Sequence, residues 1–209
     1  MNPTFIKYLK NRLKQKLPGS ISQNRMAAKR TPEINPSRGA DKAGVLILLF
    51  PRKGDLSTIL IKRSEYPGPH SGQISFPGGK TEKSDISQIE TALREAAEET
   101  GLDPDLISVL GTLTPLYIDV SNIEVLPVVG YTDRQPDFLI DPVEVKYLIQ
   151  ISLKRLTDNS LRTEKKLSVN GISINAPGFE IRNEFIWGAT AMILSEFKEI
   201  VSDAYRAIQ

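Results

Sequence analysis

The sequence predicts an α/β fold, and three stretches carry that prediction. Residues 43–50 are a continuous apolar run, which is typical of a strand buried on both faces of a sheet. Between residues 87 and 101, apolar side chains recur at helical spacing, so a helix of three to four turns can pack one face on a core. A second helix is expected to open at residues 186–192 and to end near Ala207. Together these stretches indicate a sheet covered by helices.

Residues 1–44 are basic, with ten Lys or Arg against two Asp or Glu. An apolar stripe within them predicts an amphipathic helix over residues 4–17, and residues 18–41 are polar enough to favour a linker. The simplest interpretation of the charge is a solvated helix followed by a linker or irregular wrapping, and the apolar stripe would more often pack on its own domain or on a partner subunit. Binding to a membrane surface, nucleic acid or another polyanion is the alternative. The stripe consists of Ile6, Leu9, Leu13 and Leu17.

Further strands are expected in the rest of the chain. Residues 43–50 and 56–63 are predicted to pair as a hairpin across a turn at residues 51–55. Glycines and prolines crowd residues 63–79, which predicts a shaped loop. The remaining expected elements are a strand at 109–115, a loop at 117–122, a strand at 125–131, a strand leading into a short helix at 144–156, and a hairpin at 157–183.

Composition excludes several classes of protein. The chain has 209 residues, of which 40% are hydrophobic, enough to build a core. It has no cysteine and one histidine, His70, so disulfides, thiolate chemistry and a zinc site built from several histidines are excluded. No apolar run approaches the ~18 residues of a membrane span, and the first residues lack the apolar stretch of a signal peptide. We therefore expect a cytoplasmic protein with a basic helix and linker over residues 1–40 and one domain over residues 41–209.

The predicted helix at 87–101 carries an unusual charge pattern. Ser87 and Glu90 have the spacing of a capping box at its start, and Gly101 suits the residue just past its end. Three glutamates share one face at i, i+3 and i+4, a spacing at which like charges disfavour a helix by roughly 0.2–0.5 kcal/mol per pair. They also lie near the helix C-terminus, which is the wrong end for anions. The three are Glu95, Glu98 and Glu99.

Two interpretations of this acidic cluster are open. It is either a solvated helix face or a site for a divalent cation. Arg94 can relieve part of the repulsion by pairing with Glu98 at i+4, and a bound cation would relieve the rest. Mg²⁺ prefers oxygen ligands and usually binds through carboxylates together with substrate phosphates. The surrounding sequence favours the cation site.

Residues 94–102, Arg-Glu-Ala-Ala-Glu-Glu-Thr-Gly-Leu, with Phe-Pro-Gly-Gly before them at 76–79, resemble the signature of Nudix hydrolases. The match is full over residues 94–102 and departs upstream. There the glycine of the signature falls on Lys80, and its first glutamate falls on Ile86. A one-residue insertion restores the glycine and puts Asp85 near the glutamate position. We therefore treat Glu82 and Asp85 as secondary candidates.

The resemblance implies a fold and a metal. The fold would be a Nudix-type α/β/α sandwich with a mixed central β-sheet, here with an N-terminal helical extension. The metal would be Mg²⁺ or Mn²⁺, held by Glu95, Glu98 and Glu99.

The loop before the signature is similar to the motif of coenzyme A pyrophosphatases, and the resemblance covers roughly residues 43–205. Two positions in the loop depart from that motif: Lys62 replaces a threonine, and Gly68 replaces an arginine two positions before the histidine. If that arginine binds the substrate phosphate in the family, its absence here affects the affinity for the substrate or the identity of the substrate. The matching positions are Arg63, Ser64, His70, Gly72, Gln73, Phe76, Pro77, Gly78 and Gly79.

For several of these residues, a substrate role implied by the resemblance stands beside a structural one. Arg63 would clamp phosphate or form an ion pair, and His70 would face the substrate or only make hydrogen bonds within its loop. The glycines would shape the backbone or direct their amides at phosphate. Trp187, in a closing motif Ile-Trp-Gly-Ala-Thr-Ala, is expected to pack in the core. The substrate-binding candidates are Arg63, His70, Gln73, Gly78 and Gly79.

The reaction implied by the resemblance is cleavage of a diphosphate by water. Glu95 and Glu99 are expected to be the primary metal ligands, and Glu98 to bind a second ion or to activate water. Arg94 is expected to orient these carboxylates without touching substrate. Glu144 is a candidate general base, with a surface acid as the alternative; Lys146 breaks a second acidic position of the family nearby. Coenzyme A would yield 3′,5′-ADP and 4′-phosphopantetheine.

Two other functions stay open on the sequence. One keeps the enzyme class but changes the substrate to ADP-ribose, a dinucleoside polyphosphate or another nucleoside diphosphate derivative. The other is a non-catalytic Nudix-fold module that binds a nucleotide or nucleic acid. The intact Arg-Glu-x-x-Glu-Glu cluster disfavours this second function, because a protein without catalytic activity gains nothing from acids that repel one another. We expect a small-molecule partner and neither a membrane nor nucleic acid, and a homodimer is one option for the assembly.

Overall fold

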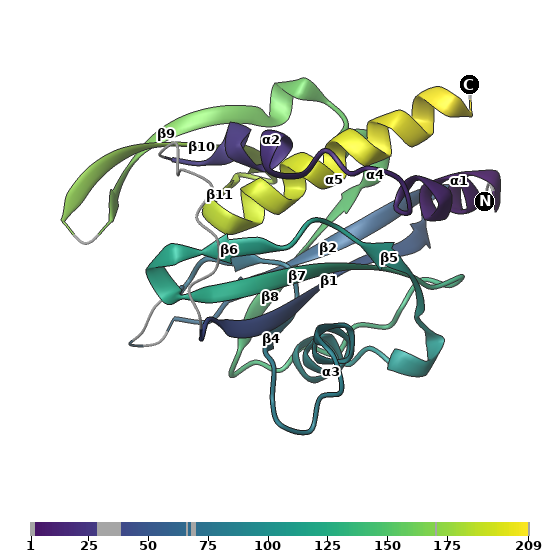
Figure 1. Ribbon diagram of the computed structural model, residues 1–209, viewed down its shortest axis with the longest axis horizontal. Coiled ribbons are helices and arrows are strands. Elements are labelled where there is room, and N and C mark those ends of the chain that lie inside the picture. The colour runs from purple at the N-terminus through teal and green to yellow at the C-terminus, as the bar shows by residue number, and fades with distance from the viewer. Residues whose placement is uncertain (1–2, 29–38, 66, 68–69, 170, 209) are drawn as a thin grey trace.

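A mixed β-sheet lies between two layers of helices in the computed structural model (Figure 1). The structure describes residues 3–28, 39–65, 67, 70–169 and 171–208. Helix α3 (Gln88–Thr100) covers one face of the sheet, and helix α5 (Gly188–Ala207) covers the other. This arrangement confirms the predicted α/β/α sandwich.

Among the described residues, eight strands form the central sheet. Its main order is β3-β2-β1-β7-β5, while β4 pairs with β1, β6 with β7 and β8 with β2. Strands β1 and β7 run parallel and the other pairs are antiparallel, so the sheet is mixed, as expected. The strands are β1 (Asp41–Arg52), β2 (Asp55–Arg63), β3 (Ile74–Ser75), β4 (Gly78–Lys80), β5 (Ser108–Thr112), β6 (Leu116–Ile118), β7 (Ile123–Tyr131) and β8 (Val145–Ser152).

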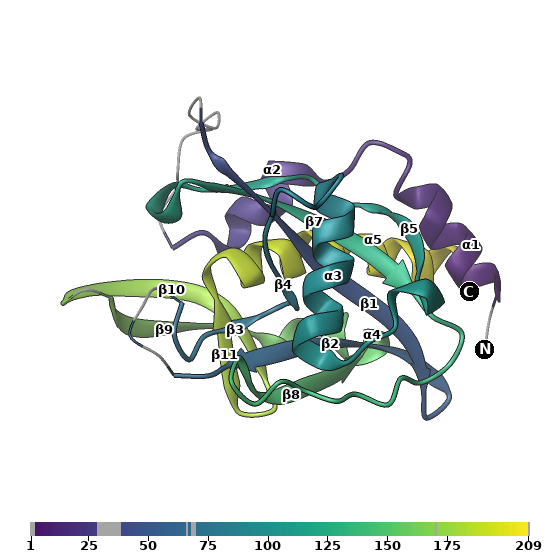
Figure 2. The same cartoon turned by 90° about the horizontal axis from the view of Figure 1, so that it is seen from below.

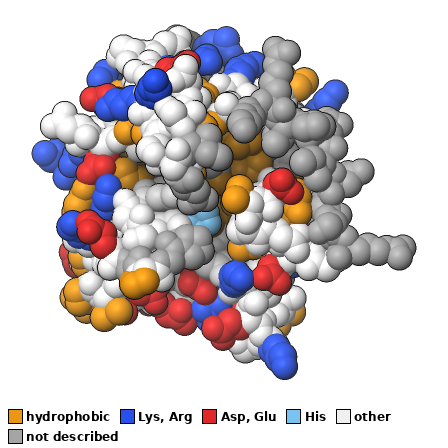
Figure 3. All heavy atoms as spheres, turned by 90° about the vertical axis from the view of Figure 1, so that its left-hand side faces the viewer, with side chains coloured by type: hydrophobic (Ala, Val, Ile, Leu, Met, Phe, Trp, Pro, Cys, Tyr) orange, Lys and Arg blue, Asp and Glu red, His pale blue; other side chains and the backbone are white. Residues whose placement is uncertain are grey.

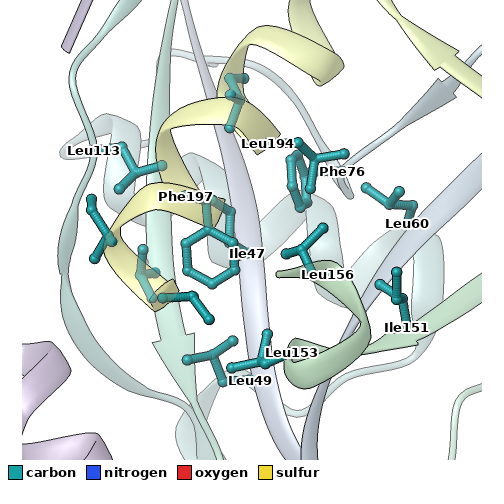
Figure 4. Close-up of a cluster of buried hydrophobic side chains, with 14 of the residues drawn as sticks. Ile47, Leu49, Leu60, Phe76, Leu113, Ile151, Leu153, Leu156, Leu194 and Phe197 are labelled. Atoms are coloured by element: carbon teal, nitrogen blue, oxygen red, sulfur yellow. The ribbon is translucent and has the colours of Figure 1, made fainter. Parts of the chain in front are cut away.

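Strand β1 separates two hydrophobic cores. Because side chains alternate along a strand, Leu46 and Leu48 pack on the α3 side, whereas Ile47 and Leu49 pack on the α5 side. Figure 4 shows Ile47 and Leu49 beside Phe197 of α5. All five side chains are fully buried. The apolar run therefore has no polar position because helices cover both faces of the strand.

The N-terminal segment packs along α5, so its apolar stripe packs on its own domain, but its elements differ in extent from those expected (Figure 1). Helix α1 (Pro3–Arg12) is shorter than the expected 4–17, although Leu9 and Leu13 are buried as the stripe requires. Residues 19–26, expected to be linker, form α2 (Gly19–Gln23) and a 3₁₀ turn, η1 (Asn24–Met26). The reason is tertiary, since the side chain of Gln23 donates a 2.9 Å hydrogen bond to the buried Glu196 of α5. Residues 29–38 of the expected linker lie outside the described residues.

A second sheet lies beside the first and contains β9 (Arg162–Val169), β10 (Ile172–Ile181) and β11 (Glu184–Trp187). Strands β9 and β10 are the predicted hairpin. The last helix begins at Gly188, slightly later than expected, because Ile186 and Trp187 pair with β10. Ile186 is fully buried and Trp187 is half-buried.

One further expectation was wrong in part. The segment at 117–122, expected to be a loop, begins in strand β6 and continues in a 3₁₀ turn, η3 (Asp119–Ser121), because β6 pairs with β7. The strand and short helix at 144–156 are confirmed as β8 and α4 (Leu153–Leu156). Two 3₁₀ turns complete the fold, η2 (Pro104–Leu106) and η4 (Asn159–Leu161). None of the helices in the described ranges is long and apolar enough to cross a membrane.

Candidate active site

Helix α3 carries the acidic cluster, and its two ends are fixed by local contacts. The hydroxyl of Ser87 accepts a 3.3 Å hydrogen bond from the backbone N–H of Glu90. Gly101 ends the helix in the left-handed conformation, with its N–H donating to Ala97. The Glu90 carboxylate accepts from the N–H of Ile86, so only half of the expected capping box forms. Figure 2 shows α3 lying across the sheet beside β4.

Strand β4 passes close to this helix because it begins with two glycines. A Cβ at Gly78, whose φ is 150°, would lie 2.3 Å from the carbonyl oxygen of Gly44 in β1. A Cβ at Gly79 would lie 2.4 Å from the carboxylate of Glu95. Phe76 holds the segment in place by packing in the core on the α5 side of the sheet (Figure 4). The two glycines thus let the sheet backbone and the helix carboxylates come together.

Glu99 is the most buried of the three glutamates, with 1% of its side chain exposed. It accepts a 2.8 Å hydrogen bond from the N–H of Gly78 and a 3.2 Å hydrogen bond from Arg63. Burial raises the pKa of Glu99 to about 7; these two donors oppose the rise, and the charges of Glu144 and Glu95 add to it. Near neutral pH this carboxyl group is therefore poised between its protonated and ionised forms.

Arg94 pairs with the other two glutamates. Its guanidinium lies 3.0 Å from a carboxylate oxygen of Glu95 and 3.0 Å from one of Glu98, which is the expected i,i+4 pair. Burial raises the pKa of Glu95, and Arg94 partly offsets the rise. Glu98 lies at the solvent edge, with 58% of its side chain exposed. On the face drawn in Figure 3, acidic and basic side chains gather together along the lower edge, on the side where α3 lies.

Asp85 holds Arg94 from the other side. The Nε and Nη2 groups of Arg94 donate to the two carboxylate oxygens of Asp85 at 2.9 and 3.0 Å. Asp85 also accepts 2.9 Å hydrogen bonds from the backbone N–H of Glu82 and the hydroxyl of Thr91. Arg94 above all holds the pKa of Asp85 well below its usual range. Asp85 therefore positions Arg94, whereas Glu82 contributes its backbone and its side chain is exposed.

Glu144 reaches the site from the segment that follows β7. The N–H of Asp141 donates to the carbonyl of Glu99, and the N–H of Ser64 donates to the carbonyl of Glu144. The side chain of Glu144 is exposed, and its charge raises the pKa of both Glu95 and Glu99. A carboxylate distant in sequence thus acts on the same site as the helix glutamates.

Arg63, Gln73 and His70 lie together at the start of the loop. The β2–β8 pairing shifts register at Arg63, which directs this side chain to Glu99. Its Nε is buried and has no hydrogen-bond partner in the part of the chain that the structure describes. The N–H of Arg63 donates to the carbonyl of Gln73, whose side chain contacts the ring of the exposed His70 at 3.2 Å. Gly68 lies outside the described residues.

Two lysines at departures from the coenzyme A motif form ion pairs. Lys62 lies 3.1 Å from Glu184 of β11, and Lys146 lies 3.2 Å from Glu65. Lys62 therefore links the central sheet to the second sheet.

Across residues 3–28, 39–65, 67, 70–169 and 171–208, no group of three or more Asp, Glu or His side chains has the geometry of a metal site. The carboxylates that the sequence assigns to a metal instead contact arginines: Glu99 contacts Arg63, and Glu95 and Glu98 contact Arg94. The donor chemistry still fits a hard divalent cation, since all the groups offer oxygen. The raised pKa values of Glu95 and Glu99 fit it too, because burial disfavours their ionised forms and a bound cation would stabilise those forms.

Comparison with known proteins identifies the class to which this fold and site belong. A family model described as the NUDIX domain matches residues 41–156, more than half of the chain. The chain therefore belongs to the Nudix family of hydrolases, which act on phosphorus anhydrides and generally use divalent metal ions.

Relatives in this family carry the name NudL. A protein of Pectobacterium atrosepticum, described as an uncharacterized Nudix hydrolase NudL, is 34% identical over 176 residues, covering 82% of this chain and 88% of its own. A protein of Yersinia pestis with the same description is 35% identical over 161 residues, covering 77% and 80%. Among solved structures, the Nudix hydrolase RenU of M. smegmatis matches with a TM-score of 0.54 and 15% identity, over 78% of this chain and 87% of its own. That likeness shows the shared fold.

The sequence pointed to most of this neighbourhood but left two contacts undecided. Asp85 was a secondary candidate, and the signal for it was the one-residue insertion before Arg94. The pairing of Arg63 with Glu99 has no local signal, because the two residues lie on different elements, 36 positions apart.

Proposed function

We propose that this Nudix hydrolase cleaves the diphosphate linkage of coenzyme A or its derivatives. The products would be 3′,5′-ADP and 4′-phosphopantetheine, or the acyl-phosphopantetheine from a thioester. The observation that carries this proposal is the group of carboxylates around Gly78 and Gly79. Burial raises the pKa values of Glu95 and Glu99 there, the charge of Glu144 adds to both, and Arg63 lies beside Glu99.

The side chains that would hold Mg²⁺ or Mn²⁺ are Glu95, Glu98 and Glu99. When bound, such an ion neutralises phosphate charge and lowers the pKa of water. Glu99 would bind in its ionised form, with the N–H of Gly78 supporting the charge. Glu98, the most exposed of the three, would serve a second ion or accept a proton from water. Arg94 would keep Glu95 and Glu98 oriented, since Asp85 already fixes its guanidinium.

On the substrate side, Arg63, His70 and Gln73 would contact the ligand. The side chain of Arg63 is 22% exposed, so its guanidinium would meet a phosphate oxygen through its solvent-exposed atoms, whereas its Nε is enclosed by protein. Glu144, exposed and close enough to influence Glu95 and Glu99, would be the second candidate for the general base. Gly79 would act mainly by giving the Glu95 carboxylate room. The N–H of Gly78 already donates to Glu99. A contact between that amide and a phosphate would therefore require the hydrogen bond to Glu99 to break.

Coenzyme A is favoured as the substrate by the loop motif at residues 63–79 and by the closing motif at residues 186–191. The NudL names of the relatives are consistent with this subfamily but state no substrate. A cytoplasmic location also belongs to the proposal, as does a small-molecule partner. A homodimer is a hypothesis that sedimentation analysis would test.

A hydrolysis panel tests the substrate. Coenzyme A, an acyl-coenzyme A, ADP-ribose and NADH would be compared at equal concentration with Mg²⁺ or Mn²⁺, and the products identified by mass. We expect the highest kcat/KM for a coenzyme A compound, with 3′,5′-ADP released. A markedly higher kcat/KM for ADP-ribose would reject coenzyme A and leave the hydrolase assignment in place. The matched blank is Glu99→Gln, which separates this activity from that of a contaminant.

A further inference from the structure

A cavity of about 460 Å³ shares no lining residue with the acidic site, by which we mean the site around Glu95, Glu98, Glu99 and Glu144. It is bounded by the β1–β2 turn, the end of β8, α4 and the β10–β11 turn. Its volume lies within the range of roughly 300–1,000 Å³ found for small-molecule sites. Arg52 at this cavity is seven positions along β1 from Val45, the partner of Gly78, which corresponds to roughly 23 Å in an extended strand.

The lining of this cavity is cationic. Four of its side chains are basic and two, Asp55 and Glu180, are acidic, so the lining carries a net charge of +2. Both acids already have partners. Asp55 accepts hydrogen bonds from the N–H of Leu56 and the hydroxyl of Tyr205, and Glu180 pairs with Lys165 at 2.9 Å. The four basic residues are Arg52, Lys53, Arg155 and Arg182.

Three of these cations are free to bind a ligand. Arg155 forms an ion pair with Asp158. Arg52, Lys53 and Arg182 form no ion pair with any residue that the structure describes. The cavity therefore has a net positive charge, whereas the acidic site is negative. Its three cations without an ion pair are available to bind an anionic ligand.

Two of the cations are placed by strained turns. Strand pairing leaves two residues in each turn, Lys53-Gly54 between β1 and β2 and Arg182-Asn183 between β10 and β11. All four have positive φ, as a type I′ turn requires, with values of 50° at Lys53 and 53° at Arg182. Asn, Asp and Gly are the residues preferred at the first position of such a turn. This chain instead has a long cation there twice, and both turns line the same cavity. Retained strain of this kind is typical of functional positions.

Polar groups inside the cavity could orient a ligand. Gln150 lines the cavity, and its side-chain amide nitrogen is a hydrogen-bond donor suited to a phosphate oxygen. Ser57 and Ser152, which face each other across the β2–β8 pair, also line the cavity. A ligand would therefore meet hydroxyl and amide groups between the cations.

We propose that this cavity binds a small molecule that carries more than one phosphate group, as a second ligand separate from the substrate that is hydrolysed. Guanidinium groups match phosphate oxygens in geometry and charge, and several unpaired cations suit a ligand with several anionic groups. The limited volume favours a small molecule over a polymer. Because the cavity supplies its own positive charge, binding there needs no divalent cation, unlike the proposed binding of substrate among the carboxylates.

Calorimetry in EDTA tests this proposal, with 3′,5′-ADP as the probe. Without divalent cations, the carboxylates of the acidic site repel the phosphates, so the cavity is the expected site. We expect wild-type protein to bind the probe and the double variant Arg52→Ala/Arg182→Ala to bind at least tenfold more weakly. The matched control removes two exposed cations from the N-terminal segment, Lys10→Ala/Lys14→Ala, and should bind as the wild type does. Because nothing is hydrolysed in EDTA, the result does not depend on the proposed function.

An NMR titration of the wild type with the same probe locates the site without any variant. Amide signals of Gly54 and Asn183 should shift, and those of α3 should stay in place. Three outcomes would overturn the proposal: no binding by the wild type, equal affinity in the Arg52→Ala/Arg182→Ala variant, or shifts confined to α3 and β4. An equal loss of affinity in the Lys10→Ala/Lys14→Ala control would overturn it as well, because it would indicate attraction by net charge alone.

Discussion

Two carboxylate–arginine pairs in the acidic site are almost equally shielded from water, yet their carboxyl groups shift in opposite directions. The side chain of Asp85 is 2% exposed and that of Glu99 is 1% exposed. Arg94 holds the pKa of Asp85 well below its usual range, whereas burial raises the pKa of Glu99 to about 7. A low exposed area therefore does not by itself decide the charge of a carboxyl group: Glu99 lies deep in the protein, where desolvation dominates its pKa, whereas Asp85 is covered near the surface, where hydrogen bonds dominate.

The number and direction of the donors add to this difference in depth. Both oxygens of Asp85 receive a hydrogen bond from Arg94, and a backbone N–H and a threonine hydroxyl add two more. Glu99 receives one hydrogen bond from Gly78 and one from Arg63, and it also faces the negative charges of two other glutamates. A carboxylate with hydrogen bonds to both oxygens, such as Asp85, therefore holds the site together, whereas Glu99, with fewer donors, keeps oxygen lone pairs available for a cation.

Removing divalent cations is expected to have the largest effect on activity. In EDTA, hydrolysis should fall to background, because only a cation would make the ionised forms of Glu95 and Glu99 compatible with a phosphate ligand. Mg²⁺ or Mn²⁺ added in excess should restore turnover, measured by product mass. Hydrolysis that continues at full rate without any divalent ion would mean that the carboxylates work in some other way.

Glu99→Gln should lower turnover at least ~100-fold, which corresponds to about 2.7 kcal/mol of barrier. The amide keeps the volume of the side chain but removes the negative charge that a cation requires. Circular dichroism should show an unchanged fold. Glu82→Gln is the matched control, since its side chain is exposed nearby, and it should retain full activity. Near wild-type kcat in Glu99→Gln would remove Glu99 from the catalytic set.

Gly79→Ala should lower turnover by about tenfold, or about 1.4 kcal/mol of barrier. The new Cβ would lie 2.4 Å from the Glu95 carboxylate, which is the flexible end of a side chain and can move away. The protein should therefore stay folded while the Glu95 carboxylate moves away from its position beside Arg94. By contrast, Gly78→Ala meets the backbone of Gly44 and should disrupt the fold. Unchanged kinetics in Gly79→Ala would show that the position of Glu95 does not matter.

Asp85→Asn should have a smaller effect on turnover than either of these substitutions, because Asp85 acts only through Arg94. The variant should melt at a lower temperature than the wild type at pH 7. The difference should shrink as the pH falls through 3.8, the ordinary pKa of an aspartate, because the folded-state pKa is depressed and the ionised form supplies the stability. Thermal melts of both proteins between pH 3 and pH 7 measure this. A difference that stays constant over that range would refute the assigned role of the Asp85 charge.

Glu99 should produce the opposite pH dependence in metal-free protein. Its folded-state pKa of about 7 lies above the ordinary 4.5, so the unfolded chain loses this proton first as the pH rises. The wild type should lose stability relative to Glu99→Gln between pH 4.5 and pH 7, and the difference should level off above pH 7. Urea unfolding of the two proteins at several pH values measures it. If the wild type instead gained stability relative to Glu99→Gln over this range, the folded-state pKa of Glu99 would be lowered, as that of Asp85 is.

Much of the fold could be predicted because its signals are local. The apolar run at 43–50, the capping residue Ser87 and the glycine at 101 each act over a few residues, and they appear in the structure as β1 and the two ends of α3. The segment at 18–26 was harder to predict. Its short helices depend on contacts of Gln23 with Thr114 and Glu196, which are remote in sequence.

The site also divides into features with local sequence signals and features that depend on contacts between remote residues. The sequence by itself determined that Glu95, Glu98 and Glu99 share one helix face and that two glycines precede them, because helical spacing and glycine geometry are properties of the local chain. Only the tertiary structure decided which arginine each carboxylate meets and that Glu99 and Asp85 take opposite pKa shifts. The physical reason is that solvation and charge depend on everything that surrounds a group in space, and folding brings those surroundings from distant parts of the chain.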